Sequence, residues 1–325
     1  MTSHPLPHAA PPVLRAARWD DLNAVAQFIY STCEAEGDTG VAVTPDELAN
    51  EWKYEGFDPG RDAFLALTPA GQVTGYAALY DTGAHCNLNG DVYLHPALTD
   101  AAATRALLRA VETRAQDHIP QAPTGERVFI RVQLADKDEA GKAVFAQEGY
   151  TAARYHWRMG IELERAPAVP ALPAGCEARP FDQAAHGQAV WQARNQAFRE
   201  NWGSRALTYE DFAYYNYDDP QYDPSLWVVI WQGDEVAGFA INHYRMGNGW
   251  VQTLGVLPAW RGKGLGAALL ARSFDAFYRR GTRSIGLGVD ASNPTGATEL
   301  YRKAGMRIVN AFVTLEKQLR AGGTA

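Results

Sequence analysis

The sequence predicts an α/β protein in which one unit, a mixed sheet flanked by helices, occurs twice. Its 325 residues suit two domains of ordinary size. A stretch of Pro, Ala and Gly at residues 166–175 cannot hold a helix and is typical of a linker. The two sides of this linker carry the same landmarks in the same order, which indicates an internal repeat.

Four pairs of segments define the repeat, at offsets of 156 to 163 residues. The pairs are 17–20 with 179–182, 73–77 with 236–240, 93–96 with 256–258, and 149–150 with 305–306. We therefore expect two domains, at residues 13–164 and 177–320, joined by a linker at 165–176. Residues 1–12 and 321–325 are expected to be a disordered lead and a disordered tail.

Each unit is expected to follow the order β-α-α-β-β-β-α-β-α-β, as the second unit illustrates. Apolar runs bounded by turn residues predict strands at 226–231, 236–244, 250–256 and 284–289. From Gly266 onward apolar side chains recur every three to four residues, which predicts an amphipathic helix that stops at Gly281. A shorter helix is expected at 296–303 and is closed by Gly305.

Composition and charge exclude several classes of function. The net charge of −7 argues against binding to nucleic acid or to an anionic membrane, and no apolar run is long enough to span a bilayer. Cys33, Cys86 and Cys176 lie far apart without a paired spacing, so we expect buried, reduced thiols in a cytoplasmic protein. The eight histidines show no ligand spacing, so no metal is expected.

The most informative segment is 256–266, where a strand ends, a glycine-rich loop follows and a helix begins. Its glycines are Gly262, Gly264 and Gly266. They allow backbone N–H groups to approach an anion closely, and the helix N-terminus adds partial positive charge. Arg261 and Lys263 add two full charges. The loop lacks the spacing of a Walker A loop or a dinucleotide fingerprint. It predicts a pyrophosphate cradle, although glycines alone also fit an ordinary turn.

The run Arg261-Gly262-Lys263-Gly264-Leu265-Gly266 resembles motif A of the GNAT acyltransferase superfamily, which reads Q/R-x-x-G-x-G/A. A second GNAT motif, N-x-x-a-x-x-L/F-Y-x-K-x-G-F/M, resembles the segment from Asn293 to Met306, which includes Leu300-Tyr301-Arg302-Lys303. The resemblance covers 177–319 well and 13–163 more weakly. It implies two tandem GNAT domains, each a mostly antiparallel twisted sheet with a splayed central strand pair flanked by helices. Two units in one chain further resemble the mycothiol-synthase-like tandem group.

The resemblance also implies acetyl-CoA as co-substrate and suggests a role for each matching residue. The pyrophosphate would contact Arg261, Gly262, Lys263, Gly264, Leu265 and Gly266, and the pantetheine would pair with the strand edge at Leu254, Gly255 and Val256. A backbone N–H of that edge would stabilise negative charge on the thioester oxygen. Tyr301 takes the family's general-acid position, the alternative being a core aromatic. Asn293 would hydrogen-bond the cofactor, the alternative being a helix cap.

The general base is left open. Many GNAT members carry a glutamate on the fourth strand, whereas Trp250-Val251-Gln252-Thr253 has no carboxylate. A water chain, His243 or Glu200 could serve instead. The stretch from Asn195 to Pro224 is rich in tyrosine and aspartate, which suits recognition of an ammonium group by cation–π contact and ion pairing. The same composition also suits a pair of helices packed on the sheet.

The first unit has lost the residues that would carry this chemistry. Where the second unit has its glycine loop, the first has Thr99-Asp100-Ala101-Ala102-Ala103-Thr104. Asp100 is expected to cap a helix and to repel phosphate. Phe145 stands in place of Tyr301, and Lys137 in place of Asn293. We therefore expect that the first unit does not bind acetyl-CoA productively, the alternative being a different set of binding residues.

The sequence thus predicts an acetyl-CoA-dependent N-acyltransferase whose second unit moves an acetyl group to a primary amine of a small molecule by direct attack. A protein or peptide N-acetyltransferase is the alternative enzyme. A non-catalytic acyl-CoA-binding regulator is the alternative outside catalysis. The chain is expected to be a monomer or a homodimer.

Overall fold

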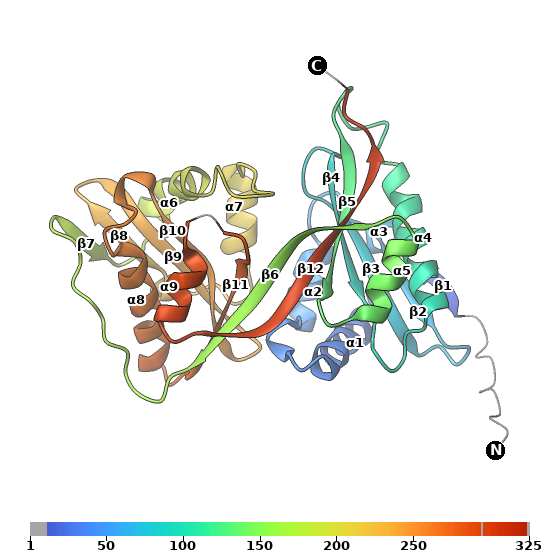
Figure 1. The fold of residues 1–325 in the computed structure, drawn as a ribbon, viewed down its shortest axis with the longest axis horizontal. Coiled ribbons are helices and arrows are strands. Elements are labelled where there is room, and N and C mark those ends of the chain that lie inside the picture. Colours follow the sequence, from blue (N-terminus) through green and yellow to red (C-terminus); the bar gives the residue numbers. More distant parts are fainter. Residues whose placement is uncertain (1–11, 294, 324–325) are drawn as a thin grey trace. The chain divides into compact units, whose positions relative to one another are not determined.

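The computed structural model describes residues 12–293 and 295–323, in two compact units (Figure 1). Unit 1 comprises the chain up to Ala153 and again from Val313, and unit 2 comprises Arg154–Phe312. The expected lead lies outside the described residues except for position 12, and the last two residues of the expected tail lie outside them as well.

The first half of the sequence forms strands and helices in the expected order, with one additional short helix, α3. The elements are β1 (Val13–Ala16), α1 (Leu22–Ala35), α2 (Pro45–Trp52), α3 (Pro59–Asp62), β2 (Ala63–Leu67), β3 (Val73–Asp81), β4 (Asn87–Tyr93), α4 (Ala101–Gln116), β5 (Val128–Ala135), α5 (Glu139–Gln147) and β6 (Thr151–Glu162). The short helix α3 begins at Pro59, after the Asp58 side chain that caps it, which is the usual place for a helix-starting proline.

The second half repeats this order. Its elements are β7 (Cys176–Arg179), α6 (Gln183–Ala197), α7 (Tyr209–Asn216), β8 (Val228–Gln232), β9 (Glu235–Arg245), β10 (Asn248–Val256), α8 (Leu265–Arg279), β11 (Ser284–Asp290), α9 (Ala297–Lys303) and β12 (Arg307–Arg320). The strand expected from residue 226 begins at Val228, because Pro224–Leu226 forms a 3-10 turn capped by Asp223. Gly281, with φ of 85°, stops α8 as expected.

The sheet of each unit is mixed and mostly antiparallel. In unit 1 the strand order is β1-β2-β3-β4-β5-β12, and in unit 2 it is β6-β11-β10-β9-β8-β7. The parallel pairs are β4 with β5 and β10 with β11. In unit 2 the parallel register covers only Gly249 with Ile285 and Trp250 with Gly286, so the two strands separate beyond Trp250. The expected splay of the central strand pair is therefore present.

More than half of the last strand of each sequence half lies in the other unit. Arg154 to Glu162 of β6 pair with β11 in unit 2, and the part of β12 from Val313 packs in unit 1. The two compact units therefore do not coincide with the domains drawn from the repeat, since 154–164 fall in unit 2 and 313–320 in unit 1. The pattern of an amphipathic strand does not specify which sheet it joins, so the repeat alone could not reveal this exchange.

Buried side chains and ion pairs hold the exchanged strands in place. In unit 1, Val313 and Leu315 join the apolar core, each worth about 1.5–3 kcal/mol of burial. Glu316 accepts a hydrogen bond of 2.9 Å from Arg131 of β5. In unit 2, Met159 of β6 is fully buried, and Arg154 pairs with Asp290 at the end of β11.

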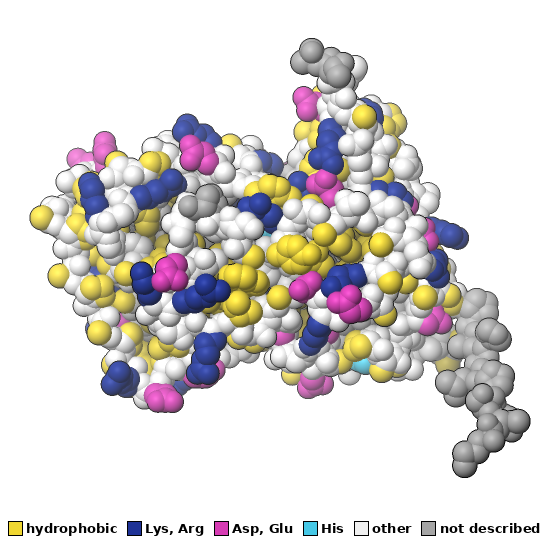
Figure 2. Space-filling view, viewed as in Figure 1, with side chains coloured by type: hydrophobic (Ala, Val, Ile, Leu, Met, Phe, Trp, Pro, Cys, Tyr) yellow, Lys and Arg dark blue, Asp and Glu magenta, His cyan; other side chains and the backbone are white. Residues whose placement is uncertain are grey.

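The surface carries charges of both signs. On the face drawn in Figure 2, Lys and Arg side chains lie beside Asp and Glu side chains, and no single basic area dominates that face. Over residues 12–293 and 295–323, no helix combines the length and apolar composition of a membrane span. Of the three cysteines, Cys33 is buried as expected, whereas Cys86 and Cys176 are partly exposed and correct that expectation.

Candidate functional site

The loop between β10 and α8 has the backbone conformation that its glycines suggest. Gly262 and Gly264 have φ of 74° and 81°, a region in which side-chain-bearing residues are strained. A Cβ at either position would meet nothing within 4 Å, so the space in front of the loop is open. Gly264 is the N-cap of α8 and offers no side chain to cap it. The N–H groups of the first turn, at 265–267, precede the first intrahelical bond from Ala268 and can face an anion.

The remaining residues of the loop anchor it or carry charge. Leu265 is buried, and a Cβ on Gly266 would lie 3.1 Å from Leu300, so only the backbone of these two residues can meet a ligand. The contact between Gly266 and Leu300 also places α9 beside the start of α8. Lys263 is exposed, with its ammonium 4.6 Å from the centre of the Trp260 ring.

Arg261 braces the loop instead of extending into solvent. Its Nε donates to the carbonyl of Val256 at 3.3 Å, and its Nη2 donates to the carbonyl of Ala197 at 3.0 Å. Ala197 is the last residue of α6, so this side chain ties the loop to a neighbouring helix terminus. The sequence suggests a direct phosphate contact, and the geometry gives the guanidinium a positioning role in this structure.

The splayed edge of β10 presents backbone groups to the gap. The N–H of Leu257 donates to Ala237 of β9 at 3.1 Å. Because N–H directions alternate along a strand, those of Leu254 and Val256 point away from β9, toward the edge left by β11. Gly255 faces the interior, where a Cβ would lie 2.7 Å from the Phe239 ring, so its lack of a side chain serves packing.

Tyr301 lies on α9 and is buried. It belongs to the same apolar cluster as Leu254 and Leu300, which brings the phenol and the β10 edge to one region of unit 2. Burial raises the pKa of Tyr301 to about 12, so the hydroxyl stays protonated at neutral pH. Both readings of this residue fit the geometry: the ring packs in the core, and the hydroxyl holds a proton that it could donate.

Asn293 forms a tight turn before α9. Its Oδ1 accepts from the N–H of Thr295 at 2.9 Å and from the Thr295 hydroxyl at 2.6 Å. The helix N-cap itself is Gly296, so the alternative of an Asn293 cap is wrong. The side-chain nitrogen Nδ2 of Asn293 takes no part in these two bonds.

The two residues named as possible general bases, His243 and Glu200, have different surroundings. His243 on β9 lies directly opposite Trp250, the first residue of the stretch that lacks a carboxylate. Its Nδ1 lies 3.0 Å from Oδ2 of Asp219, and its Nε2 is buried without a hydrogen-bond partner among the described residues. Glu200, the other named residue, is exposed. Asp219 as the partner of His243 was not predicted, although it lies within the aspartate-rich stretch.

Opposing influences act on the pKa of Asp219, and their net effect is to hold it below its ordinary value. Burial is the largest single influence and raises it, but the hydrogen bond to His243, a backbone N–H from Gln221 and the nearby charges of His243 and Arg245 together lower it by more. The carboxylate therefore stays charged, and in a neutral His243 ring it favours the Nδ1–H tautomer, in which Nε2 carries a lone pair.

The aromatic stretch is divided between core and surface. Tyr209, Tyr217 and Tyr222 pack in an apolar cluster around Trp227. Two of its aromatic side chains, Trp202 and Tyr215, are exposed, at 36% and 46%. Within the stretch 195–224 only the end of α6 and α7 are α-helical, and its aromatic side chains are divided between an apolar cluster and the surface.

The equivalent region of unit 1 lacks these features. Asp100 caps α4, and its Oδ1 accepts from the N–H of Ala103 at 2.8 Å, as predicted. Phe145 is fully buried against Tyr150, and the Lys137 ammonium donates to the carbonyl of Glu36. In unit 1 a carboxylate therefore caps the N-terminus of α4, whereas in unit 2 the N-terminus of α8 has no capping side chain.

Comparison with known proteins places this geometry in a family. The profile described as the acetyltransferase (GNAT) family matches residues 187–306, which include the loop and Tyr301. A mycothiol acetyltransferase of Salinispora tropica is 30% identical over 313 residues, which cover 93% of this chain and 96% of that protein. One from Kineococcus radiotolerans is 33% identical over 244 residues, which cover 72% and 75%. The chain belongs to the GNAT acetyltransferase family.

Solved structures agree with this membership over the whole chain. A GCN5-related N-acetyltransferase from Sphaerobacter thermophilus superposes with a TM-score of 0.81 at 30% identity and covers 99% of both chains. A tandem GNAT protein from the clavulanic acid biosynthesis pathway shares the fold, with a TM-score of 0.70 at 15% identity. This GNAT protein is thus an acyl-CoA-dependent acetyltransferase with two tandem units.

Proposed function

We propose that unit 2 of this GNAT protein transfers an acetyl group from acetyl-CoA to a primary amine of a small molecule by direct attack. The observation that carries the proposal is the open edge of β10, which leads into a glycine loop at the uncapped start of α8. The name of these relatives, mycothiol acetyltransferase, supports a small-molecule acceptor.

The loop and the strand edge would hold the two ends of acetyl-CoA. The N–H groups at the start of α8 and the Lys263 ammonium would bind the pyrophosphate, while Arg261 keeps the loop in shape. The outward N–H groups of Leu254 and Val256 suit strand-like pairing with pantetheine. The N–H of Leu254, which lies in the same cluster as Tyr301, suits the charge that develops on the thioester oxygen.

Tyr301 would give its proton to the thiolate that leaves. A pKa of about 12 exceeds the ordinary value of a thiol, near ~8.5, which alone disfavours the transfer. The burial that raises the phenol pKa also acts on a thiolate bound beside it, since both charged forms lose hydration. The transfer converts thiolate and phenol into thiol and phenolate. Because burial raises both pKa values, the difference between them narrows, and the transfer loses less driving force.

His243 would accept the proton of the attacking amine. Asp219 orients the ring and leaves Nε2 without a proton, which is the form that a general base requires. Its place opposite Trp250 puts it next to the strand position from which the carboxylate is missing. Exposed Glu200 has no comparable support.

A panel of small amines, with CoA thiol release as the readout, tests this function. Acetylated product and CoA in equal amounts would support it. Acetylation of peptides but not of free amines would favour the alternative peptide acetyltransferase. Binding of acetyl-CoA without turnover on any acceptor would contradict the proposal and favour the regulator.

A further inference from the structure

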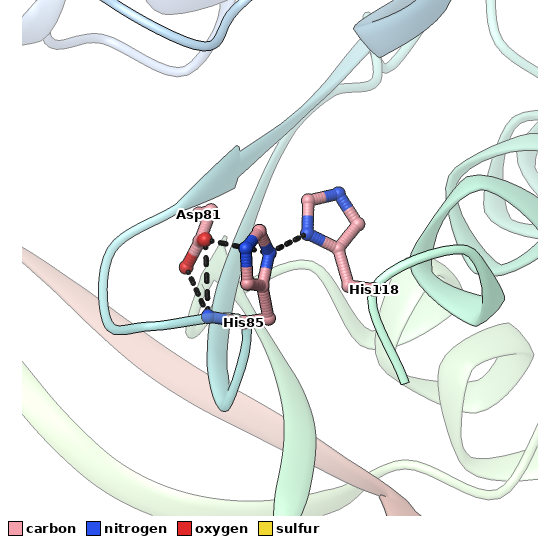
Figure 3. A group of neighbouring side chains, drawn as sticks. All are labelled: Asp81, His85 and His118. Atoms are coloured by element: carbon pink, nitrogen blue, oxygen red, sulfur yellow. Dashed lines mark hydrogen bonds and ion pairs between the residues drawn. The ribbon is translucent and has the colours of Figure 1, made fainter. Parts of the chain in front are cut away.

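Three side chains of unit 1 converge at the end of the hairpin formed by β3 and β4 (Figure 3). Asp81 is the last residue of β3, His85 lies in the hairpin turn, and His118 follows the end of α4. One ligand atom from each lies within 4.8 Å of the others. None of them belongs to the acetyl transfer site, which is in unit 2.

The nitrogen Nδ1 of His85 faces two partners at once. It lies 2.9 Å from Oδ2 of Asp81 and 2.9 Å from Nδ1 of His118. A neutral imidazole has one N–H, which can align with only one of them. If His85 donates to the carboxylate, the lone pair of His118 is left without a donor. If His118 donates to His85, a ring lone pair faces the carboxylate. A cation at the centre of the three atoms removes this conflict.

The side chains are held in place by the surrounding backbone. The Asp81 carboxylate accepts from the N–H of Gly83 at 3.0 Å and from that of His85 at 3.0 Å. This arrangement keeps His85 at a φ of 62°, which is uncommon for a residue with a side chain. The N–H of His118 is bonded to Ala115 in the last turn of α4. These backbone bonds thus fix the positions of the residues that carry the ligand atoms.

Nearby charge does not prevent a cation from binding. Two basic residues lie near the cluster. Arg320 donates to the carbonyl of Ile119, beside His118, at 2.9 Å, and Arg114 pairs with Asp62 at 2.6 Å and with Asp117 at 3.1 Å. Two carboxylates therefore offset the charge of Arg114.

We propose that Asp81, His85 and His118 bind one Zn²⁺ ion. Two imidazole nitrogens and one carboxylate oxygen suit zinc and related transition metals, whereas Mg²⁺ and Ca²⁺ prefer oxygen ligands alone. Tetrahedral bonds of about 2.0–2.1 Å set the ligand atoms roughly 3.3 Å apart. Nδ1 of His85 lies 2.9 Å from each of its partners and all three ligand atoms lie within 4.8 Å of one another, so the side chains need to adjust their positions to bind the ion. The side chain of His85 is 34% exposed, which allows this movement and leaves a fourth position for water.

The bound ion would fasten the hairpin turn to the end of α4. Both are otherwise joined in this region by the contact between the two rings. The sequence pattern does not reveal this site because the two histidines are 33 residues apart, and only the i,i+4 spacing of Asp81 and His85 is local.

Calorimetric titration of Zn²⁺ into the full-length, chelator-treated protein tests the proposal. We expect one strong site in the native chain, and binding at least about 100-fold weaker in His85→Gln and Asp81→Asn, since even loss of a ligand's supporting partner costs about 10–100-fold. His95→Gln is the matched control in unit 1 and should bind as the native chain does. Zinc should raise Tm in the native chain and in this control only.

A second readout separates ligand loss from misfolding. The visible spectrum of bound Co²⁺ reports its ligand set, and it should change in each cluster variant while acetyl-CoA binding in unit 2 is kept. Unchanged zinc affinity in both His85→Gln and Asp81→Asn would overturn the proposal and place the metal elsewhere. Failure of the native protein to bind Zn²⁺ would overturn it as well.

Discussion

His243 and Asp219, which lie 24 residues apart in the sequence, meet at 3.0 Å between Nδ1 and Oδ2. The pair leaves Nε2 of the histidine buried and without a hydrogen bond to a described residue. An imidazole in this state can take up a proton, and its carboxylate partner would stabilise the resulting charge. The same pair affects both the proposed catalysis and the stability of unit 2 at acidic pH.

We expect His243→Gln to lower kcat/KM by roughly 10²–10⁴ while the Kd for acetyl-CoA stays unchanged. The cause is loss of the proton acceptor, whereas the cofactor contacts lie on β10 and α8. Glu200→Gln is the matched control and should retain full activity. Steady-state kinetics and calorimetry on both variants give the answer. If the Glu200 variant is the one that loses activity, the assignment of the base is wrong.

Asp219 should make unit 2 less stable in acid. Its pKa is lower in the folded protein than in the unfolded chain, so its stabilising contribution is present above the unfolded value. That contribution is lost as the pH falls through the folded pKa. Asp219→Asn should therefore lower Tm at neutral pH and flatten its decline in acid. Thermal unfolding between neutral and acidic pH measures this, and parallel curves for the two proteins would contradict it.

Tyr301→Phe should lower kcat by roughly 10²–10⁴ with little change in acetyl-CoA affinity or Tm. The ring keeps its packing, and no described residue accepts a hydrogen bond from its hydroxyl. Tyr244→Phe is a fitting control because Tyr244 packs against the same cluster, with its hydroxyl 3.3 Å from Thr282. An unchanged kcat in Tyr301→Phe, measured where chemistry limits turnover, would remove this residue from the mechanism.

Gly264→Glu should abolish acetyl-CoA binding. A side chain there would enter the open space before the loop, and its charge would repel the pyrophosphate. Its φ of 81° also makes any side chain strained, so a control with equal strain is needed. Gly281, at the other end of α8, has φ of 85° and equally open surroundings. Gly281→Glu should lose similar stability and still bind acetyl-CoA. Normal binding by Gly264→Glu would show that the cradle lies elsewhere.

The order of elements could be predicted from the sequence because apolar periodicity and glycine stops are local signals. The loop conformation and the Asp100 cap could be predicted for the same reason, since each depends on a few consecutive residues. Side-chain direction could not be predicted: Arg261 turns back to Ala197, and Gly255 is needed for packing against Phe239. The partners of His243 and His85 depend on long-range packing, which no local pattern encodes.

The exchange of last strands escaped prediction for a different reason. β6 and β12 each close a repeat in the sequence, and their composition suits either sheet. Specific pairs then distinguish the two sites: Arg154 of β6 meets Asp290, while Glu316 of β12 meets Arg131. Such pairs join residues more than a hundred positions apart, so they become visible only in the folded chain.

We expect the chain to bind one acetyl-CoA, in unit 2. In unit 1 the helix terminus that would face a pyrophosphate is already capped, since Asp100 accepts the N–H of Ala103 at 2.8 Å. Removing that carboxylate would not restore a glycine loop, and Phe145, where unit 2 has Tyr301, has no proton to donate. On this view the first unit has a structural role and binds no cofactor.

Titration calorimetry on the native chain and on two variants decides the stoichiometry. The native chain and Asp100→Asn should each bind one acetyl-CoA, because neutralising the cap leaves the loop without glycines or cations. Gly264→Glu should bind none. A second site in the native chain that survives Gly264→Glu and weakens when unit 1 is altered would mean that unit 1 binds CoA through residues unrelated to the repeat. If the titration shows a single site, and only Gly264→Glu abolishes it, acetyl-CoA binds in unit 2, where the N-terminus of α8 has no capping side chain.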